Sequence, residues 1–295
     1  MKCVHWLLVL SMFVVSLTGC IESLTEIVVQ KDGSGFVYQA SYMNIDGNPL
    51  AAALGQFGAE NAKPKEVTVD EEGFAKAAGR LGEGVRLEWV KKKQNAKGWD
   101  GILAKYAFDD VTQLQLKGAG LGISHENGVI KPQENKADRT GMSERELKFD
   151  FSAGDTSELT MVLPAMTLPQ QPALSVGRSP FPGPSDQALE GDNQPPEAQL
   201  GPMMAMLGPI LEGARFLIRV RVDGEIVETD ASYVSKKGVV GIMDLKLADL
   251  FANKENLQVL QRLQGMEDED AIRAALADVK GLHMELQPEV SVKFQ

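Results

Sequence analysis

Cysteine and histidine are scarce in this chain, and their scarcity limits the chemistry that it can perform. Among 295 residues there are two cysteines, Cys3 and Cys20, and three histidines. Neither His125 nor His283 has a further ligand at metal-binding spacing, so we expect no metal site. Both cysteines lie near the N-terminus, so no disulfide can brace a domain farther along the chain.

Motifs that mark an active site or a cofactor site are also absent. There is no nucleophile elbow and no P-loop, and the glycine run 118–122 misses the dinucleotide pattern, because Ile123 falls where its third glycine would stand. The run Ser124-His125-Glu126 does not predict a triad, because triad members normally converge from separate elements. We expect no catalytic residue and no cofactor.

The chain has no excess of basic charge and no long apolar run. Its formal net charge is −11, so nucleic acid and anionic headgroups repel it as a whole. A nucleic-acid partner is therefore not expected. The apolar stretch Val4–Val15 is shorter than the roughly 20 residues that span a bilayer.

The N-terminus has the layout of a secretory signal peptide over residues 1–19. Met1-Lys2 supplies a basic start, Val4–Val15 an apolar core, and Leu17-Thr18-Gly19-Cys20 a run of small residues before a cut site. Removal of Met1–Gly19 leaves Cys20 as the first residue and the sole cysteine of the mature chain.

Leu17-Thr18-Gly19-Cys20 resembles the lipobox of bacterial lipoproteins. The resemblance implies that the Cys20 thiol carries a diacylglycerol and that the new amine receives a further acyl chain such as palmitate. Two or three acyl chains hold a protein on a membrane durably, whereas one holds it marginally. Ile21 follows in place of an aspartate, which favours the periplasmic face of the outer membrane, with the inner membrane left open.

Alternating apolar residues predict a β-rich chain. Leu24–Gln30 and Phe36–Met43, joined around Asp32-Gly33, predict a hairpin, and a second is predicted from Phe216–Val222 and Glu225–Tyr233 around Asp223-Gly224. In Phe36–Met43 the residues Phe36, Tyr38, Ala40 and Tyr42 share one face. The other predicted strands are 85–89, 102–108, 147–151, 159–163, 238–245, 284–286 and 290–294.

Helices are predicted between these strands, over Pro49–Glu60, Glu71–Gly82, Leu247–Phe251, Asn256–Leu263 and Asp270–Leu282. Asp70 is the expected N-cap of the second helix and Gly82 its stop, and His283 is expected to cap the end of the last one. Gly118–Ser143 is expected to be a long loop.

Hairpins mixed with helices favour an α+β fold, with an antiparallel β-sheet built from hairpins and packed with several helices. Residues 164–202 hold nine of the 14 prolines and predict a disordered insert or linker. It would separate an N-terminal part, 20–163, from a C-terminal part, 203–295, which are either one domain or a duplicated unit. A hairpin directly after a lipobox also loosely resembles poorly characterised LppM-like lipoproteins, which implies no catalytic residues.

Three functions follow as hypotheses. The first is a membrane-anchored, non-enzymatic cell-envelope protein that binds or scaffolds another envelope component. The second is a lipid-binding module, in which the predicted helix Met203–Ala214 and aromatic strand faces line an apolar cavity. The hydrophobic surface for a ligand or partner would consist of Met203, Met204, Met206, Leu207, Ile210 and Leu211, although a helix that is apolar nearly all round is more often core. The third is a carboxylate-based envelope hydrolase using Asp109-Asp110 or the acidic run Glu267–Asp270, although acidic residues before a helix usually cap it.

Overall fold

The computed structural model describes residues 21–43, 68–117, 123–126, 128–132, 146–164, 211, 213–235, 237–263, 266 and 268–295. The predicted signal peptide, Cys20, the helix predicted over Pro49–Glu60 and the proline-rich segment after Pro164 lie outside these residues. The predictions for those segments therefore stay predictions.

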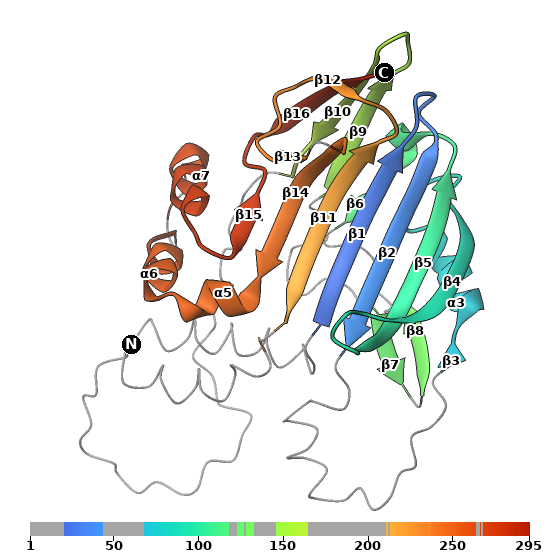
Figure 1. Cartoon of the computed structure of the whole chain (residues 1–295), viewed down its shortest axis with the longest axis horizontal. Helices are drawn as coiled ribbons and strands as arrows, with labels where there is room; N and C mark the ends of the chain where they lie inside the picture. The colour runs from blue at the N-terminus through green and yellow to red at the C-terminus, as the bar shows by residue number, and fades with distance from the viewer. Residues whose placement is uncertain are drawn as a thin grey trace, which may run out of the picture.

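A large sheet forms the body of the fold (Figure 1). Its strands lie side by side in the order β13 (Val234–Ser235), β14 (Val239–Lys246), β11 (Arg215–Val222), β1 (Ile21–Val29), β2 (Gly35–Met43), β5 (Asp100–Phe108) and β4 (Arg86–Gln94), and β15 (Leu282–Met284) also pairs with β14. The first predicted hairpin is confirmed as β1–β2, with Gly33 at φ +84° in the turn. Glycine suits this position because the left-handed region carries little steric penalty for it.

The large sheet is mixed, and the expectation of an antiparallel sheet built from hairpins is correct only in part. β1 and β11 run parallel in the centre of the sheet, with Glu22 opposite Arg215 and Val29 opposite Val222. Parallel neighbours cannot be joined by a tight turn, so this pairing joins segments that are far apart in the chain. The N-terminal and C-terminal parts consequently share one sheet.

A second, antiparallel sheet packs on one face of the first. Its order is β12 (Ile226–Thr229), β16 (Glu289–Phe294), β10 (Ser157–Val162), β9 (Glu146–Ser152) and β6 (Leu116–Lys117). A small third sheet is formed by β3 (Thr68–Val69), β8 (Val129–Pro132) and β7 (Ile123–Glu126). Because β7 and β8 form a hairpin inside Gly118–Ser143, the prediction of one long loop there was wrong.

The second predicted hairpin is also wrong. After β11 the chain leaves the large sheet, and β12 pairs with β16 of the other sheet. The Asp223-Gly224 turn makes this crossing, since the Asp223 N–H donates to the Val29 carbonyl at 2.8 Å and the Glu225 N–H donates to the Gln295 carbonyl at 2.9 Å. A local turn signal gives no information on which distant strand will accept the next segment.

The helices described are short, and together with the sheets they make the fold mostly β. They are α3 (Glu71–Ala78), α5 (Leu247–Ala252), α6 (Lys254–Leu263), α7 (Glu269–Ala277) and the 3-10 helix η1 (Val111–Gln113). Asp70 caps α3 as expected, because its Oδ1 accepts the Gly73 N–H at 2.8 Å, but the helix ends at Ala78, before Gly82. No helix within the described ranges is long and apolar enough to cross a membrane.

His283 does not cap a helix as expected. It lies in β15, opposite Asp244 of β14, and its ring meets Tyr233 edge-on with 5.9 Å between the ring centroids. Helix α7 ends earlier, at Ala277. Strand pairing with β14 therefore overrides the helical pattern that continues past that residue.

The core lies on one side of the large sheet. Residues of that side, such as Val37, Tyr106 and Val220, are fully buried against Met161 and Val292 of the second sheet. Helix α3 joins the same core, and helix α5 packs in a second apolar cluster together with Phe216 and Leu245. Every layer described so far therefore covers the same face of the large sheet.

Candidate functional site

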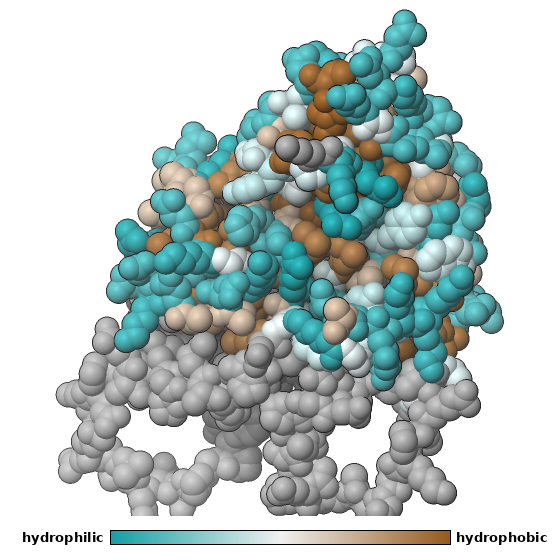
Figure 2. Space-filling model, viewed as in Figure 1, coloured by the Kyte–Doolittle hydropathy of each residue, from teal (hydrophilic) through white to brown (hydrophobic). Residues whose placement is uncertain are grey.

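The opposite face of the large sheet, which we call the outer face, is the candidate site. No described helix or strand lies across it (Figure 1), and Figure 2 shows hydrophilic and apolar side chains interspersed over it. Antiparallel strand pairs can keep one face in water, where side chains are free for contacts outside the chain. The residues that alternate with the core therefore decide what this face can bind.

Strand register arranges these residues in rows that cross the sheet. One row passes from β11 to β4 through Arg219, Glu26, Tyr38, Lys105 and Trp89. The next row, toward the start of β1, holds Leu217, Leu24, Ala40, Leu103 and Lys91. The outer face thus combines aromatic, basic and small apolar side chains on neighbouring strands.

The aromatic and basic side chains of β2, β4 and β5 are in direct contact. Lys105 Nζ lies 3.5 Å from the ring centroid of Phe36 and 5.9 Å from that of Tyr38. Lys91 Nζ lies 4.9 Å from the Trp89 ring centroid. These are cation–π contacts, which hold an ammonium group in place without neutralising its charge. We call Phe36, Tyr38, Trp89, Lys91 and Lys105 the cation–aromatic patch.

The arginines of β11 are used differently, because each is ion-paired with a carboxylate, and two of them share the same one. Arg219 pairs with Glu26, which is 9% exposed, and Arg221 Nε lies 3.1 Å from the same carboxylate. Arg215 donates two hydrogen bonds to Asp244, from Nε to Oδ1 at 2.7 Å and from Nη2 to Oδ2 at 2.8 Å. This hydrogen-bonded guanidinium lowers the pKa of Asp244 below its ordinary value of 3.8.

Lys91 of β4 and Lys105 of β5 keep an available charge. Within the described part of the chain, Lys91 and Lys105 form no ion pair, and Lys91 is exposed. The contrast with β11 divides the outer face into an ion-paired half and a cationic half. An anion would meet the cationic half with the rings of Phe36, Tyr38 and Trp89 beside it.

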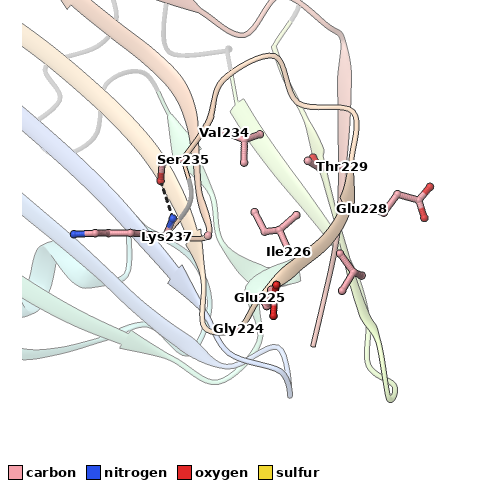
Figure 3. Close-up of a pocket in the computed structure, with 10 residues that line it drawn as sticks. Gly224, Glu225, Ile226, Glu228, Thr229, Val234, Ser235 and Lys237 are labelled. Carbon is pink, nitrogen blue, oxygen red and sulfur yellow. Dashed lines mark hydrogen bonds between the residues drawn. The ribbon is translucent and has the colours of Figure 1, made fainter.

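A pocket of about 810 Å³ lies elsewhere, between the edge strands β12 and β13 (Figure 3). Its wall includes Ile226, Glu228, Val234 and Lys237. Glu228 is already paired with Lys293 at 2.9 Å. The mixed lining does not single out a ligand chemistry.

The predicted hydrophobic surface is represented by a single described residue. Leu211 is 3% exposed and packs with Ala214, Leu247, Leu250 and Val279, so this residue belongs to the core. The other members of that prediction, from Met203 to Ile210, lie outside the described ranges. Their role stays a prediction.

The carboxylates considered for hydrolysis have structural partners. Asp109 accepts a hydrogen bond from Arg86 at 2.9 Å, and Asp110 caps η1 by accepting the Thr112 N–H at 2.9 Å. Asp268 caps α7 by accepting the backbone N–H of Asp270. The described residues include no group of three side chains suited to hold a metal ion.

Sequence reasoning missed most of the candidate site. The shared face of Phe36, Tyr38, Ala40 and Tyr42 was recognised, but not that it points away from the core. Trp89 was assigned to one face with Val85 and Leu87, whereas a β-bulge after Leu87 moves Trp89 to the outer face. Lys105 gave no signal, because an isolated lysine in a strand normally marks only a solvated position.

Comparisons with known proteins add little to this geometry. No family model matches the chain, and no curated protein matches it. Among solved structures, the chain is similar to the NMR structure of the folded domain of LppM from Mycobacterium tuberculosis. The two share 9% sequence identity with a TM-score of 0.31, over 94% of this chain and 91% of that one.

Proposed function

We propose that this chain is a lipid-anchored cell-envelope protein that binds an anionic envelope component on its outer face and performs no catalysis. The cation–aromatic patch carries the proposal, because it places lysines without ion pairs beside aromatic rings on a face that no described element covers. The lipid anchor on Cys20 supplies the location, as the lipobox resemblance implies. The favoured location is the periplasmic face of the outer membrane.

The chemistry of the patch suits a partner that is both flat and acidic. Aromatic side chains contribute large contact areas at low entropic cost, and tryptophan and tyrosine are enriched among the residues that dominate binding interfaces. The lysine ammonium groups add attraction for carboxylate or phosphate, and this attraction weakens as salt rises. An acidic glycan or an acidic protein surface offers both kinds of contact.

Binding of an acidic glycan tests the proposal directly. The full chain is titrated with alginate, a polymer of uronic acids, and with uncharged dextran as the matched polymer control. Replacing both Trp89 and Lys105 by alanine removes two contacts of about 1 kcal/mol each, which should weaken alginate binding about 30-fold. The control variant Lys148→Ala removes one exposed lysine of β9, on the second sheet, and should leave binding unchanged.

Two results of the titration count against the proposal. Equal binding of alginate and dextran would show that charge is not recognised. Equal alginate binding by the wild type and by the double variant would show that the patch is not the site. Circular dichroism of each variant separates a loss of binding from a loss of structure.

The anchor needs its own test, in cells. Metabolic labelling with palmitate should mark the wild type and should be abolished in Cys20→Ala. Membrane fractionation then assigns the labelled protein to the outer or the inner membrane. Labelling that persists in Cys20→Ala would refute lipidation at this residue.

A further inference from the structure

One end of the large sheet gathers the start of β1, the β4–β5 hairpin and the start of β11, and we call it the proximal end. In register, Ile21 lies opposite Met43, Met43 opposite Asp100, and Asp100 opposite Gln94. The hairpin loop from Asn95 to Trp99 therefore extends past the row in which β1 begins (Figure 1). Ile21, the first residue of β1, therefore lies at the same end of the sheet as this loop.

A hydrogen bond ties the hairpin loop to the first residues of β1. Asn95 Nδ2 donates to Glu22 Oε2 at 2.8 Å. Cys20 is two residues from Glu22 in the sequence, and two residues span at most about 7 Å. A lipid on Cys20 would consequently bring the β4–β5 loop to the level of the membrane headgroups.

The loop has a defined conformation. Asn95 Oδ1 accepts the N–H groups of Lys97 and Trp99 at 2.9 and 3.0 Å, and Gly98 adopts φ +78°. The Trp99 ring lies against Gly213 at the start of β11, where an added Cβ would come within 2.2 Å of it. Lys97 Nζ is held 4.7 Å from the centroid of the same ring.

The hairpin is basic, although the whole chain is acidic. Lys91, Lys92, Lys93 and Lys97 lie within seven consecutive residues, and all four are exposed. The acidic neighbours Glu22 and Asp100 accept hydrogen bonds from Asn95 and Gln94, respectively. Even with these two carboxylates counted against the four lysines, the hairpin keeps a net positive charge, unlike the whole chain with its net charge of −11.

We infer that the β4–β5 hairpin is a contact site for an anionic phospholipid bilayer. Lys93 and Lys97 face the headgroups, and Trp99 lies at the interfacial depth that indole rings prefer. This inference rests on the lipid anchor of the proposed function and deepens it. The acyl chains hold the protein at the membrane, and the hairpin sets which end of the sheet faces the bilayer, leaving the outer face accessible from the side.

Vesicle sedimentation tests the inference without the anchor. The full chain carrying Cys20→Ala is mixed with phosphatidylcholine vesicles, with or without about one quarter phosphatidylglycerol. The apolar leader contributes to both vesicle types, so the readout is the ratio of the two partition coefficients. We expect a ratio well above one that falls toward one at about 1 M salt.

Charge reversal locates the contact. Lys93→Glu with Lys97→Glu should lower the preference for anionic vesicles by about tenfold or more. The matched control reverses Lys31 and Lys148, both exposed, with Lys31 in the β1–β2 turn at the other end of the sheet. The control should keep the wild-type preference.

A second measurement reports depth. In the Trp6→Phe, Trp89→Phe background, Trp99 fluorescence should be quenched by brominated lipids in anionic vesicles only. Equal vesicle preference for the hairpin variant and its control, or no quenching of Trp99, would overturn the hairpin contact. Palmitate labelling of Cys20 is read separately, so failure of the anchor and failure of the hairpin give different results.

Discussion

Glu285 is a fully buried carboxylate whose removal should be severely destabilising. It is 0% exposed, and its hydrogen bonds connect the segment between β12 and β13 to the turn between β15 and β16. Its Oε2 accepts the Ser232 N–H at 2.7 Å. Its Oε1 accepts the Ser232 hydroxyl at 2.9 Å and the backbone N–H groups of Leu286 and Gln287 at 3.0 and 3.2 Å.

The number of N–H donors that lose their acceptor sets the size of the destabilisation. Glu285→Ala leaves three backbone N–H groups without an acceptor, whereas the Ser232 hydroxyl can rotate to another partner. A buried donor left unpaired costs about 1–3 kcal/mol, but water can reach part of these three, because Ser232 is exposed and Leu286 and Gln287 are half-buried. We therefore expect a total loss in the lower part of the summed range, roughly 3–5 kcal/mol of unfolding free energy. Glu285→Gln keeps an acceptor at one position and directs an amide group at the other donors, so we expect a smaller loss of about 1–3 kcal/mol.

Urea denaturation measures both losses on the same scale. The alanine variant should unfold at the lowest urea concentration, the glutamine variant at an intermediate one, and both should keep the wild-type slope. Thermal unfolding gives a parallel reading, since about 4 kcal/mol lowers the Tm of a domain of this size by about 8–16 °C. A loss under about 1 kcal/mol for Glu285→Ala would refute the reasoning, because the donors would then have found other acceptors.

Three further predictions concern single side chains. Tyr106→Phe should leave the unfolding free energy unchanged or raise it by about 1 kcal/mol in urea denaturation, because the Tyr106 hydroxyl is buried without a hydrogen-bond partner in the described structure; a clear loss would reveal a partner. Asn256→Ala should lower it by about 2 kcal/mol, since Nδ2 donates to the Leu250 and Lys280 carbonyls at 3.0 and 2.8 Å. Asn256→Asp should be at least as destabilising, because it sets a carboxylate oxygen against those carbonyls in a buried site; a smaller loss for aspartate than for alanine would contradict this. Asp244→Asn should lower the unfolding free energy at about pH 7, and its difference in unfolding free energy from the wild type should shrink as pH falls below 3.8, because the Arg215 hydrogen bond lowers the pKa of Asp244 and protonation removes that stabilisation. A difference that does not change with pH would contradict this.

Local signals predicted the elements that depend on near neighbours. The Asp32-Gly33 turn, the Asp70 cap and the alternation in Ile102–Phe108 all gave the correct structure, because each depends on contacts within a few residues. Asp223-Gly224 carries the same turn signal as Asp32-Gly33, yet β12 pairs with β16. The two turns lead to different structures because β2 pairs with the strand that precedes it, whereas β12 pairs with a strand from the end of the chain.

The candidate site was harder to predict, because the alternation of residues along a strand does not indicate which of its two faces packs against the core. In Gly35–Met43 the more aromatic set, with Phe36 and Tyr38, faces outward, whereas Gln39 and Ser41 share the buried side with Val37. Aromatic residues would ordinarily be assigned to the interior on hydrophobicity. Their outward position departs from the expected pattern, and it is one reason why we propose the outer face as a binding surface.

The sequence by itself determined the β-rich character of the chain and the first hairpin, because these depend on patterns within short contiguous segments; its leader and lipobox stay predictions of the same local kind. Only the tertiary structure decided that β11 joins β1 in parallel, that every described layer covers one side of the sheet, and that Lys105 meets Phe36 and Tyr38. Such contacts join residues far apart in the chain, and their free energy comes from burial and register across strands. No local window of sequence contains that information.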